Sequence, residues 1–248
     1  MNIQNELDGF KLDLIELLRH NLVQIYITGS YSLDDFRVGR GDLDFIVVTK
    51  AEIAEKKVPA IWTLFESYRY GKSVIKRQLE GTFIPIKKLI EPKSDALCLY
   101  VGTSRQGWRT THLFPNAMID LKLLLKTQKK LFADFDCDIY EPSNEELKNE
   151  RKNTFRNYKK YPEAEAMLSY AHWLCRTIFL LDKGEIVSKT EACKYVTGCL
   201  TTNEDKHNSM LFSEMRDPAE DGFLTNYSKF LPTIQEIENL YLMREGAA

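Results

Sequence analysis

Hydrophobic positions in the first half of the chain follow two periods, one typical of amphipathic helices and one typical of strands. We predict helices at 5–21, 51–70 and 119–132, and strands at 24–28, 44–48 and 76–86. The segment 97–101 fits a further strand or a loop, and a short helix is expected to start near Ser30. This alternation predicts a small mixed sheet with helices.

The pattern changes after residue 134. The segment 134–144 has little periodicity, and Pro142, Ser143 and Asn144 followed by two glutamates indicate a helix start. Beyond it the periodicity is helical throughout, at 145–161, 164–183, 189–200, 206–212 and 226–242. We therefore expect an α+β chain of two domains. Residues 1–142 would form the mixed sheet with its helices, and residues 143–248 an α-helical bundle.

Composition narrows the class of protein. A length of 248 residues, 44% of them hydrophobic and 28% charged, is typical of a soluble globular protein. The net charge of −2 argues against a protein that binds along nucleic acid. The five cysteines form no C-x-x-C pair, which indicates free thiols in a reducing cytosol. The N-terminal segment has no signal-peptide core and no apolar run reaches 18 residues, so we expect a cytoplasmic protein.

The chemistry is concentrated around the second predicted strand. Gly29 and Ser30 end the preceding strand, and Asp42 and Asp44 open the next one. Side chains alternate along a strand, so the two aspartates share one face, roughly 6.5–7 Å apart. Their carboxylates repel each other unless a cation compensates, and Mg²⁺ prefers carboxylate and phosphate oxygens. Backbone N–H groups of the Gly-Ser turn can hold phosphate. The sequence therefore predicts a site for Mg²⁺ and a nucleoside triphosphate, although a D-x-D pair alone also occurs on exposed strands and turns.

This combination resembles the signature of polymerase-β-like nucleotidyltransferases. It is carried by Gly29, Ser30, Gly41, Asp42 and Asp44. The resemblance implies that Gly29 and Ser30 hold the phosphates, and that both aspartates are catalytic and bind the metal.

In that family a third carboxylate comes from a neighbouring strand. The candidate is Glu80, at the head of a β-branched and aromatic run that suits a strand. The resemblance implies that Glu80 binds metal and acts as general base for the acceptor hydroxyl. The alternative is a surface glutamate at a strand end.

A second resemblance covers most of the chain, to the streptomycin/spectinomycin adenylyltransferases that modify aminoglycosides. It rests on Arg176, the turn at 184–186 and Lys189, with the strand at 79–82 matching an L/V-E-V-T pattern and the helix at 119–125 a D-L-x-x-L-L pattern. It implies that Arg176 and Lys189 bind the nucleotide. The alternatives are a salt bridge for Arg176 and a solvated first-turn position for Lys189.

The chain also departs from that family. The segment 157–165 lacks the Trp that contacts streptomycin there, and its acids are Glu163 and Glu165. These two can pair with a cationic drug or, as we favour, lie on a solvated helix face. The loop at 87–113 differs, and the loop at 31–41 is longer and lacks a Gly-Gly pair. ATP chemistry is therefore better supported than the antibiotic.

We accordingly expect a monomeric, Mg²⁺-dependent adenylyltransferase. It would move AMP from ATP to a hydroxyl of an aminoglycoside, release pyrophosphate and confer antibiotic resistance, with the helical domain binding the substrate. A second hypothesis keeps the chemistry and changes the acceptor to another small molecule or a protein side chain. A third is a non-enzymatic nucleotide-binding protein, against which three retained acids argue.

Overall fold

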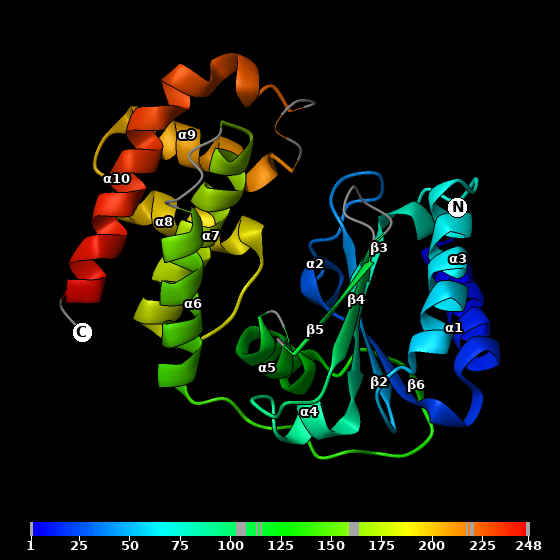
Figure 1. Cartoon of the computed structure of the whole chain (residues 1–248). Helices are drawn as coiled ribbons and strands as arrows, with labels where there is room; N and C mark the ends of the chain where they lie inside the picture. Colours follow the sequence, from blue (N-terminus) through cyan, green and yellow to red (C-terminus); the bar gives the residue numbers. More distant parts are fainter. Residues whose placement is uncertain are drawn as a thin grey trace. The chain divides into compact units, whose positions relative to one another are not determined.

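The computed structural model describes residues 2–102, 108–112, 114, 116–158, 164–216, 218 and 221–246. The chain divides into two compact units, Met1–Pro142 and Ser143–Ala248, and each has its own hydrophobic core (Figure 1).

Among the described residues, the first unit forms a six-stranded sheet in the order β5-β4-β3-β2-β1-β6. The strands are β1 (Leu22–Ile27), β2 (Leu43–Thr49), β3 (Leu79–Pro85), β4 (Cys98–Gly102), β5 (Trp108–Thr111) and β6 (Lys130–Ala133). The helices are α1 (Ile3–Leu18), α2 (Gly29–Ser32), α3 (Val58–Arg69), α4 (Ile86–Ile90) and α5 (Ala117–Thr127). Strands β2 and β3 pair in parallel and the other neighbours pair antiparallel, so the predicted mixed sheet is confirmed.

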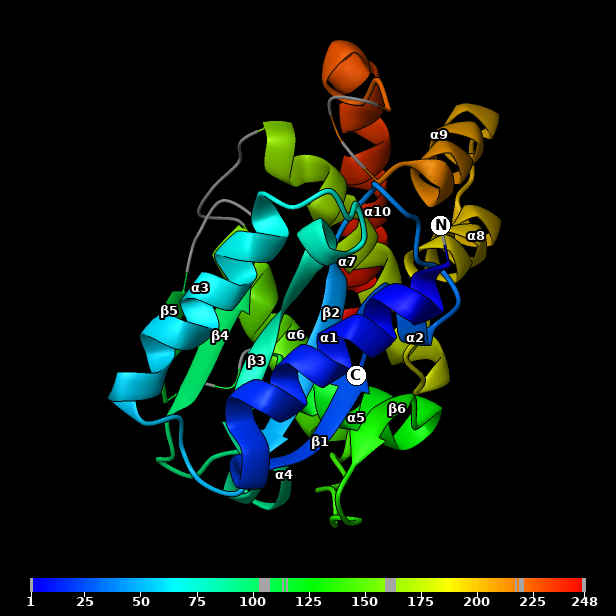
Figure 2. The ribbon, with the colours of Figure 1, turned by 90° about the vertical axis from the view of Figure 1, so that its right-hand side faces the viewer.

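Helices α1 and α3 cover one face of the sheet, and α5 lies on the other side (Figures 1 and 2). The covered face is apolar: Phe45 of β2 packs against Phe10 of α1 with ring centroids 5.1 Å apart and stacks on Phe65 of α3 at 5.6 Å. Because side chains alternate along a strand, the neighbours of these core residues point to the opposite face. Asp44 and Glu80 are on that opposite face.

Gly81 of β3 lies directly against Phe45 of β2. A Cβ atom at this position would lie 2.1 Å from the carbonyl oxygen of Phe45 and 2.7 Å from its ring. The L/V-E-V-T pattern has Val here, and this chain has Gly because the aromatic ring already fills the space.

One helix of the predicted set is too long. The prediction of a helix over 119–132 is wrong at its end, because α5 stops at Thr127 and Gln128 takes a left-handed φ of 48°. The following residues form β6, antiparallel to β1, and Leu131 and Phe132 pack against the core of the sheet. These residues have a helical spacing of apolar positions, but pairing with the free edge of β1 makes them a strand.

Two further parts of the first unit, the strands β4 and β5 and the start of helix α3, were not fully predicted. The segment 97–101, left between strand and loop, belongs to β4, and β5 lies in a stretch where no strand was predicted. The helix predicted from residue 51 begins at Val58, with Pro59 in its first turn, where the missing N–H of proline leaves no bond unmade.

The second unit is helical in all its described secondary structure, as predicted. Its helices are α6 (Asn144–Tyr158), α7 (Ala164–Lys183), α8 (Lys189–Cys199), α9 (Asn203–Glu214) and α10 (Tyr227–Gly246). Its core is built around Trp173, Phe212 and Tyr241. Ser143 and Glu146 form a capping box at the predicted helix start, with Ser143 N donating to Glu146 Oε2 at 3.2 Å and Glu146 N to Ser143 Oγ at 3.3 Å. None of the helices in the described part of the chain is long and apolar enough to cross a membrane.

Candidate active site

The parallel pairing of β2 and β3 brings two of the predicted acids side by side. Asp44 and Glu80 are direct partners in the register, and neighbouring strands lie about 4.8 Å apart. Asp42 comes two residues before Asp44 and immediately precedes β2. Asp42 is exposed, while Asp44 and Glu80 are partly buried. Asp44 and Glu80 thus lie side by side at the amino-terminal ends of two central strands, and Asp42 lies just before the first of them.

Gly29 is in direct contact with this group. It follows β1, adopts a φ of +58°, and a Cβ atom on it would lie 1.9 Å from Asp44 Oδ2. The N–H of Thr28 donates to the carbonyl oxygen of Asp44 at 2.9 Å. Ser30 is the second residue of the one-turn helix α2 that starts here. The structure therefore places the predicted phosphate turn against the predicted metal ligand, and only a residue without a side chain allows this approach.

The loop that leads into Asp42 is held by Gln78. The side-chain amide of Gln78 accepts from the N–H of Gly39 at 2.8 Å and donates to the carbonyl oxygen of Gly41 at 2.7 Å. Gln78 precedes Glu80 by two residues, so one side chain ties the approach to β2 to the start of β3. Sequence analysis missed this residue, since a lone Gln carries no motif.

Tyr100 was also missed, and it contacts Glu80. Its hydroxyl donates to Glu80 Oε1 across the β3–β4 pair. Burial, this hydrogen bond and the negative charges of Glu80 and Asp42 raise the pKa of Tyr100 well above its usual range. The guanidinium of Arg109 on β5 lies 5.0 Å from the centre of the Tyr100 ring. The influence of Asp42 on the phenol indicates that Asp42 also lies near Tyr100.

The donors suit Mg²⁺ in their chemistry. Among the described residues, no three His, Cys, Asp or Glu side chains converge to form a complete metal-binding group. Mg²⁺ commonly takes only one or two carboxylates from a protein and fills its shell with water and substrate phosphates. Asp42 and Asp44, next to a turn that can hold phosphate, meet this smaller requirement.

The second unit carries a group of cations around a buried histidine. Burial and the positive charges of Lys189, Arg216 and Arg176 hold the pKa of His172 well below its usual range. His172 Nε2 bonds to the carbonyl oxygen of Phe212 at 2.8 Å, which makes this nitrogen the protonated one. Lys189 begins α8 and Arg176 lies on α7, so the structure brings these two predicted nucleotide ligands to one region.

Arg216 is the third cation of this region, and sequence analysis missed it. Its guanidinium donates to Thr190 Oγ1 at 2.6 Å and to the carbonyl oxygens of Ser213 and Met215 at 2.9 and 2.7 Å. These bonds join the end of α9 to the first turn of α8. Arg216 therefore fixes the helix end on which Lys189 lies.

Two predicted candidates cannot be placed. Glu163 and the side chain of Glu165 lie outside the described residues. Their assignment to a drug or to a solvated face stays a prediction.

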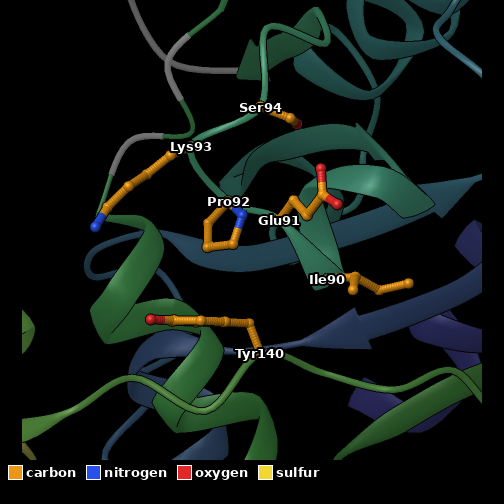
Figure 3. Close-up of a pocket in the computed structure, with 6 residues that line it drawn as sticks. All are labelled: Ile90, Glu91, Pro92, Lys93, Ser94 and Tyr140. Atoms are coloured by element: carbon orange, nitrogen blue, oxygen red, sulfur yellow. The ribbon is translucent and has the colours of Figure 1, made fainter.

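Two pockets lined by described residues of the first unit lie away from the acids. One of about 370 Å³ is lined by Ile90, Glu91, Pro92, Lys93, Ser94 and Tyr140. Figure 3 shows the carboxylate of Glu91 and the ammonium of Lys93 pointing in different directions, so its charged groups do not converge. A second pocket, of about 310 Å³, includes Cys98 and Leu99 at the end of β4 opposite to Gly102. Neither places polar groups around a common point near Asp44.

Buried Lys88 closes the loop beside the first pocket. Its ammonium donates to the carbonyl oxygens of His112 at 2.7 Å and Pro92 at 3.3 Å, and also to that of Ser94. These bonds satisfy a charge that would otherwise be costly to bury. Lys88 therefore has a structural role.

Comparison with known proteins finds similarity among solved structures. No family model matches the sequence, and no curated protein matches it significantly. Among solved structures, the chain resembles spectinomycin adenyltransferase AAD(9) from Enterococcus faecialis, solved with ATP and spectinomycin. The match covers 97% of this chain and 99% of that chain, with a TM-score of 0.66 and 18% sequence identity. The chain therefore shares the fold of that adenyltransferase. The predicted α+β class, with a helical C-terminal part, is thereby confirmed.

Proposed function

We propose that the protein is a Mg²⁺-dependent adenylyltransferase. It moves AMP from ATP to a hydroxyl of an aminoglycoside of the streptomycin/spectinomycin type and releases pyrophosphate. The observation that carries this proposal is the pairing of Asp44 with Glu80 beside Gly29. The shared fold with an adenyltransferase solved with ATP and spectinomycin supports the choice of substrates.

The first unit would supply the chemistry. Asp42 and Asp44 would hold Mg²⁺, with Glu80 beside them, and the cation would supply neutralisation of the charge on the triphosphate. Gly29 and Ser30 hold the terminal phosphates through their N–H groups and the serine hydroxyl. Glu80 accepts the proton of the acceptor hydroxyl as that oxygen attacks the α-phosphorus in line with the departing pyrophosphate.

The second unit, residues 143–248, would bind the substrates. Arg176 and Lys189 pair with nucleotide phosphates, for which cations other than Mg²⁺ are needed as charge develops. Their common influence on His172 supports this role, because it indicates that both cations lie near the same side chain. Arg216 contributes to the same positive region while holding α8 in place.

The test is pyrophosphate release from Mg·ATP with streptomycin, spectinomycin and a panel of other aminoglycosides. Asp42→Asn should lower drug-stimulated release by about 10²–10³-fold, the usual effect of removing one transition-state contact. Asp138→Asn is the matched control, since Asp138 is an exposed aspartate on the segment after β6. Both variants are expected to fold, because neither site is buried.

Three outcomes separate the hypotheses. Release that depends on one drug and on Asp42, but not on Asp138, supports the adenylyltransferase and names its acceptor. Binding of Mg·ATP without stimulation by any drug moves the acceptor to another small molecule or a protein side chain. A folded protein that binds no Mg·ATP refutes the enzyme.

A further inference from the structure

We infer that Tyr100 is a positioning residue that fixes the orientation of the Glu80 carboxylate through the hydrogen bond from its phenol to Oε1. The catalytic role of Glu80 rests on the proposed function. The hydrogen bond between Tyr100 and Glu80 is seen in the structure and is independent of that proposal.

Strand β4 shapes the environment of Glu80 from two positions. Glu80 is the register partner of Gly102, and Thr82 is the partner of Tyr100, so all four side-chain positions share one face. A Cβ atom on Gly102 would lie 3.2 Å from Glu80 Oε2 and 3.3 Å from Glu80 Cγ. The Glu80 side chain therefore lies over Gly102 while its Oε1 atom accepts the hydroxyl of Tyr100. Gly102 provides the space, and Tyr100 selects the orientation.

The Tyr100 ring is itself ordered. It is partly buried, and the guanidinium of Arg109, its register partner on β5, packs on its face at 5.0 Å from the centroid. A phenol held in this way can aim its O–H in few directions. Its hydroxyl therefore acts as a fixed donor toward Glu80.

A tyrosine suits this role better than other donors. Lys or Arg at position 100 would place a positive charge against Glu80 and weaken it as a proton acceptor. Phe would leave Oε1 without its donor. A neutral hydroxyl orients the carboxylate and keeps its charge available.

The kinetic consequence follows from the division of labour in the site. Gly29 and Ser30 hold the phosphates of ATP, so loss of the phenol should leave KM for ATP within about twofold. The step that uses Glu80 should slow by about 10- to 100-fold, the range expected for one hydrogen bond to a charged group.

The first experiment compares Tyr100→Phe with Tyr70→Phe in the pyrophosphate-release assay. Tyr70 is 78% exposed, so its variant should behave as the parent protein. Tyr100→Phe should lower kcat by about 10- to 100-fold without changing KM for ATP beyond twofold. In a Glu80→Gln background, Tyr100→Phe should have no further effect, because it acts through Glu80. Losses that multiply in the double variant would overturn the inference.

The second experiment does not need activity. In protein labelled with 3-fluorotyrosine, Tyr100→Phe identifies the ¹⁹F resonance of Tyr100. Glu80→Gln should shift that resonance, and Asp138→Asn should leave it unchanged. An unshifted resonance in Glu80→Gln would refute the contact and the inference with it. A shifted resonance in a protein that transfers AMP to no acceptor would instead count against the proposed function alone.

Discussion

Substitution of Gly29 by Ala tests the contact on which the site is built. The added methyl group would lie 1.9 Å from Asp44 Oδ2, 2.7 Å from Cγ and 3.0 Å from Cβ. Non-bonded heavy atoms settle near 3.5 Å, so the carboxylate must move by more than about 1 Å or the β1–α2 turn must open. Either change separates Asp44 from the phosphate turn.

Two effects of different size are expected from Gly29→Ala. A φ of +58° costs a residue with a side chain about 1–2 kcal/mol, which lowers the free energy of unfolding by that amount. Displacing a substrate-positioning group by about 1 Å costs on the order of 10²-fold in rate. Since a domain is usually stable by about 5–15 kcal/mol, the variant stays folded and the loss of rate cannot come from unfolding.

Gly39→Ala is the matched control. Gly39 has a φ of +82°, and its nearest neighbour for an added Cβ is Val74 Cγ1 at 3.9 Å. Urea unfolding should show a similar loss of stability in both variants, and pyrophosphate release should fall only in Gly29→Ala. Full activity in Gly29→Ala, or an equal fall in Gly39→Ala, would refute the assigned contact between the turn and Asp44.

Three further predictions concern other parts of the chain. Gln78→Met removes the side-chain hydrogen bonds to the loop 37–41, so that loop should be cleaved faster in limited proteolysis and stability should fall by about 1 kcal/mol; unchanged cleavage would contradict the role of Gln78. Gly81→Ala should destabilise by about 1–3 kcal/mol through overpacking, while Gly198→Ala, where an added Cβ meets nothing within 4 Å on α8, should be neutral or stabilising in the same thermal melts. His172 is buried and its pKa is lowered, so below about pH 6.5 its imidazole is protonated in the unfolded chain and stays neutral in the folded chain. The free energy of unfolding should therefore fall by up to about 1.4 kcal/mol for each pH unit below that value. His172→Gln should remove that part of the slope between pH 7.5 and 5.5 in urea titrations, and an identical slope in variant and parent would count against it.

The sequence allowed prediction of those parts of the site that are local along the chain. The Gly29 turn and the pair Asp42 and Asp44 lie within a short stretch, and strand alternation alone puts both aspartates on one face. Glu80 was a candidate only through resemblance, because periodicity gives no information about which strands become neighbours. The structure supplies that information in the register of Asp44 with Glu80.

The residues that support the site were not predictable, for a different reason. Tyr100 and Gln78 reach Glu80 and the loop before Asp42 only after three strands have paired, and neither residue belongs to a motif. Strand β6 was predicted as helix because its apolar spacing fits a helical period. It forms a strand because it pairs with the edge of β1 that β2 leaves open. In each case the structure depends on a contact between residues far apart in the sequence, which a local sequence pattern does not predict.

The parallel pairing of β2 with β3 also sets an order of events during folding. The antiparallel neighbours β1 and β2 close a short connection, whereas β2 and β3 must close a crossover that contains α3. Longer loops close later, so a chain that has formed only the first pairing holds Gly29 against Asp44 and still lacks Glu80. Such a chain could bind a nucleotide before it could transfer its nucleotidyl group. Recovery of turnover after refolding would therefore mark the completion of the central crossover, and nucleotide binding would mark an earlier stage.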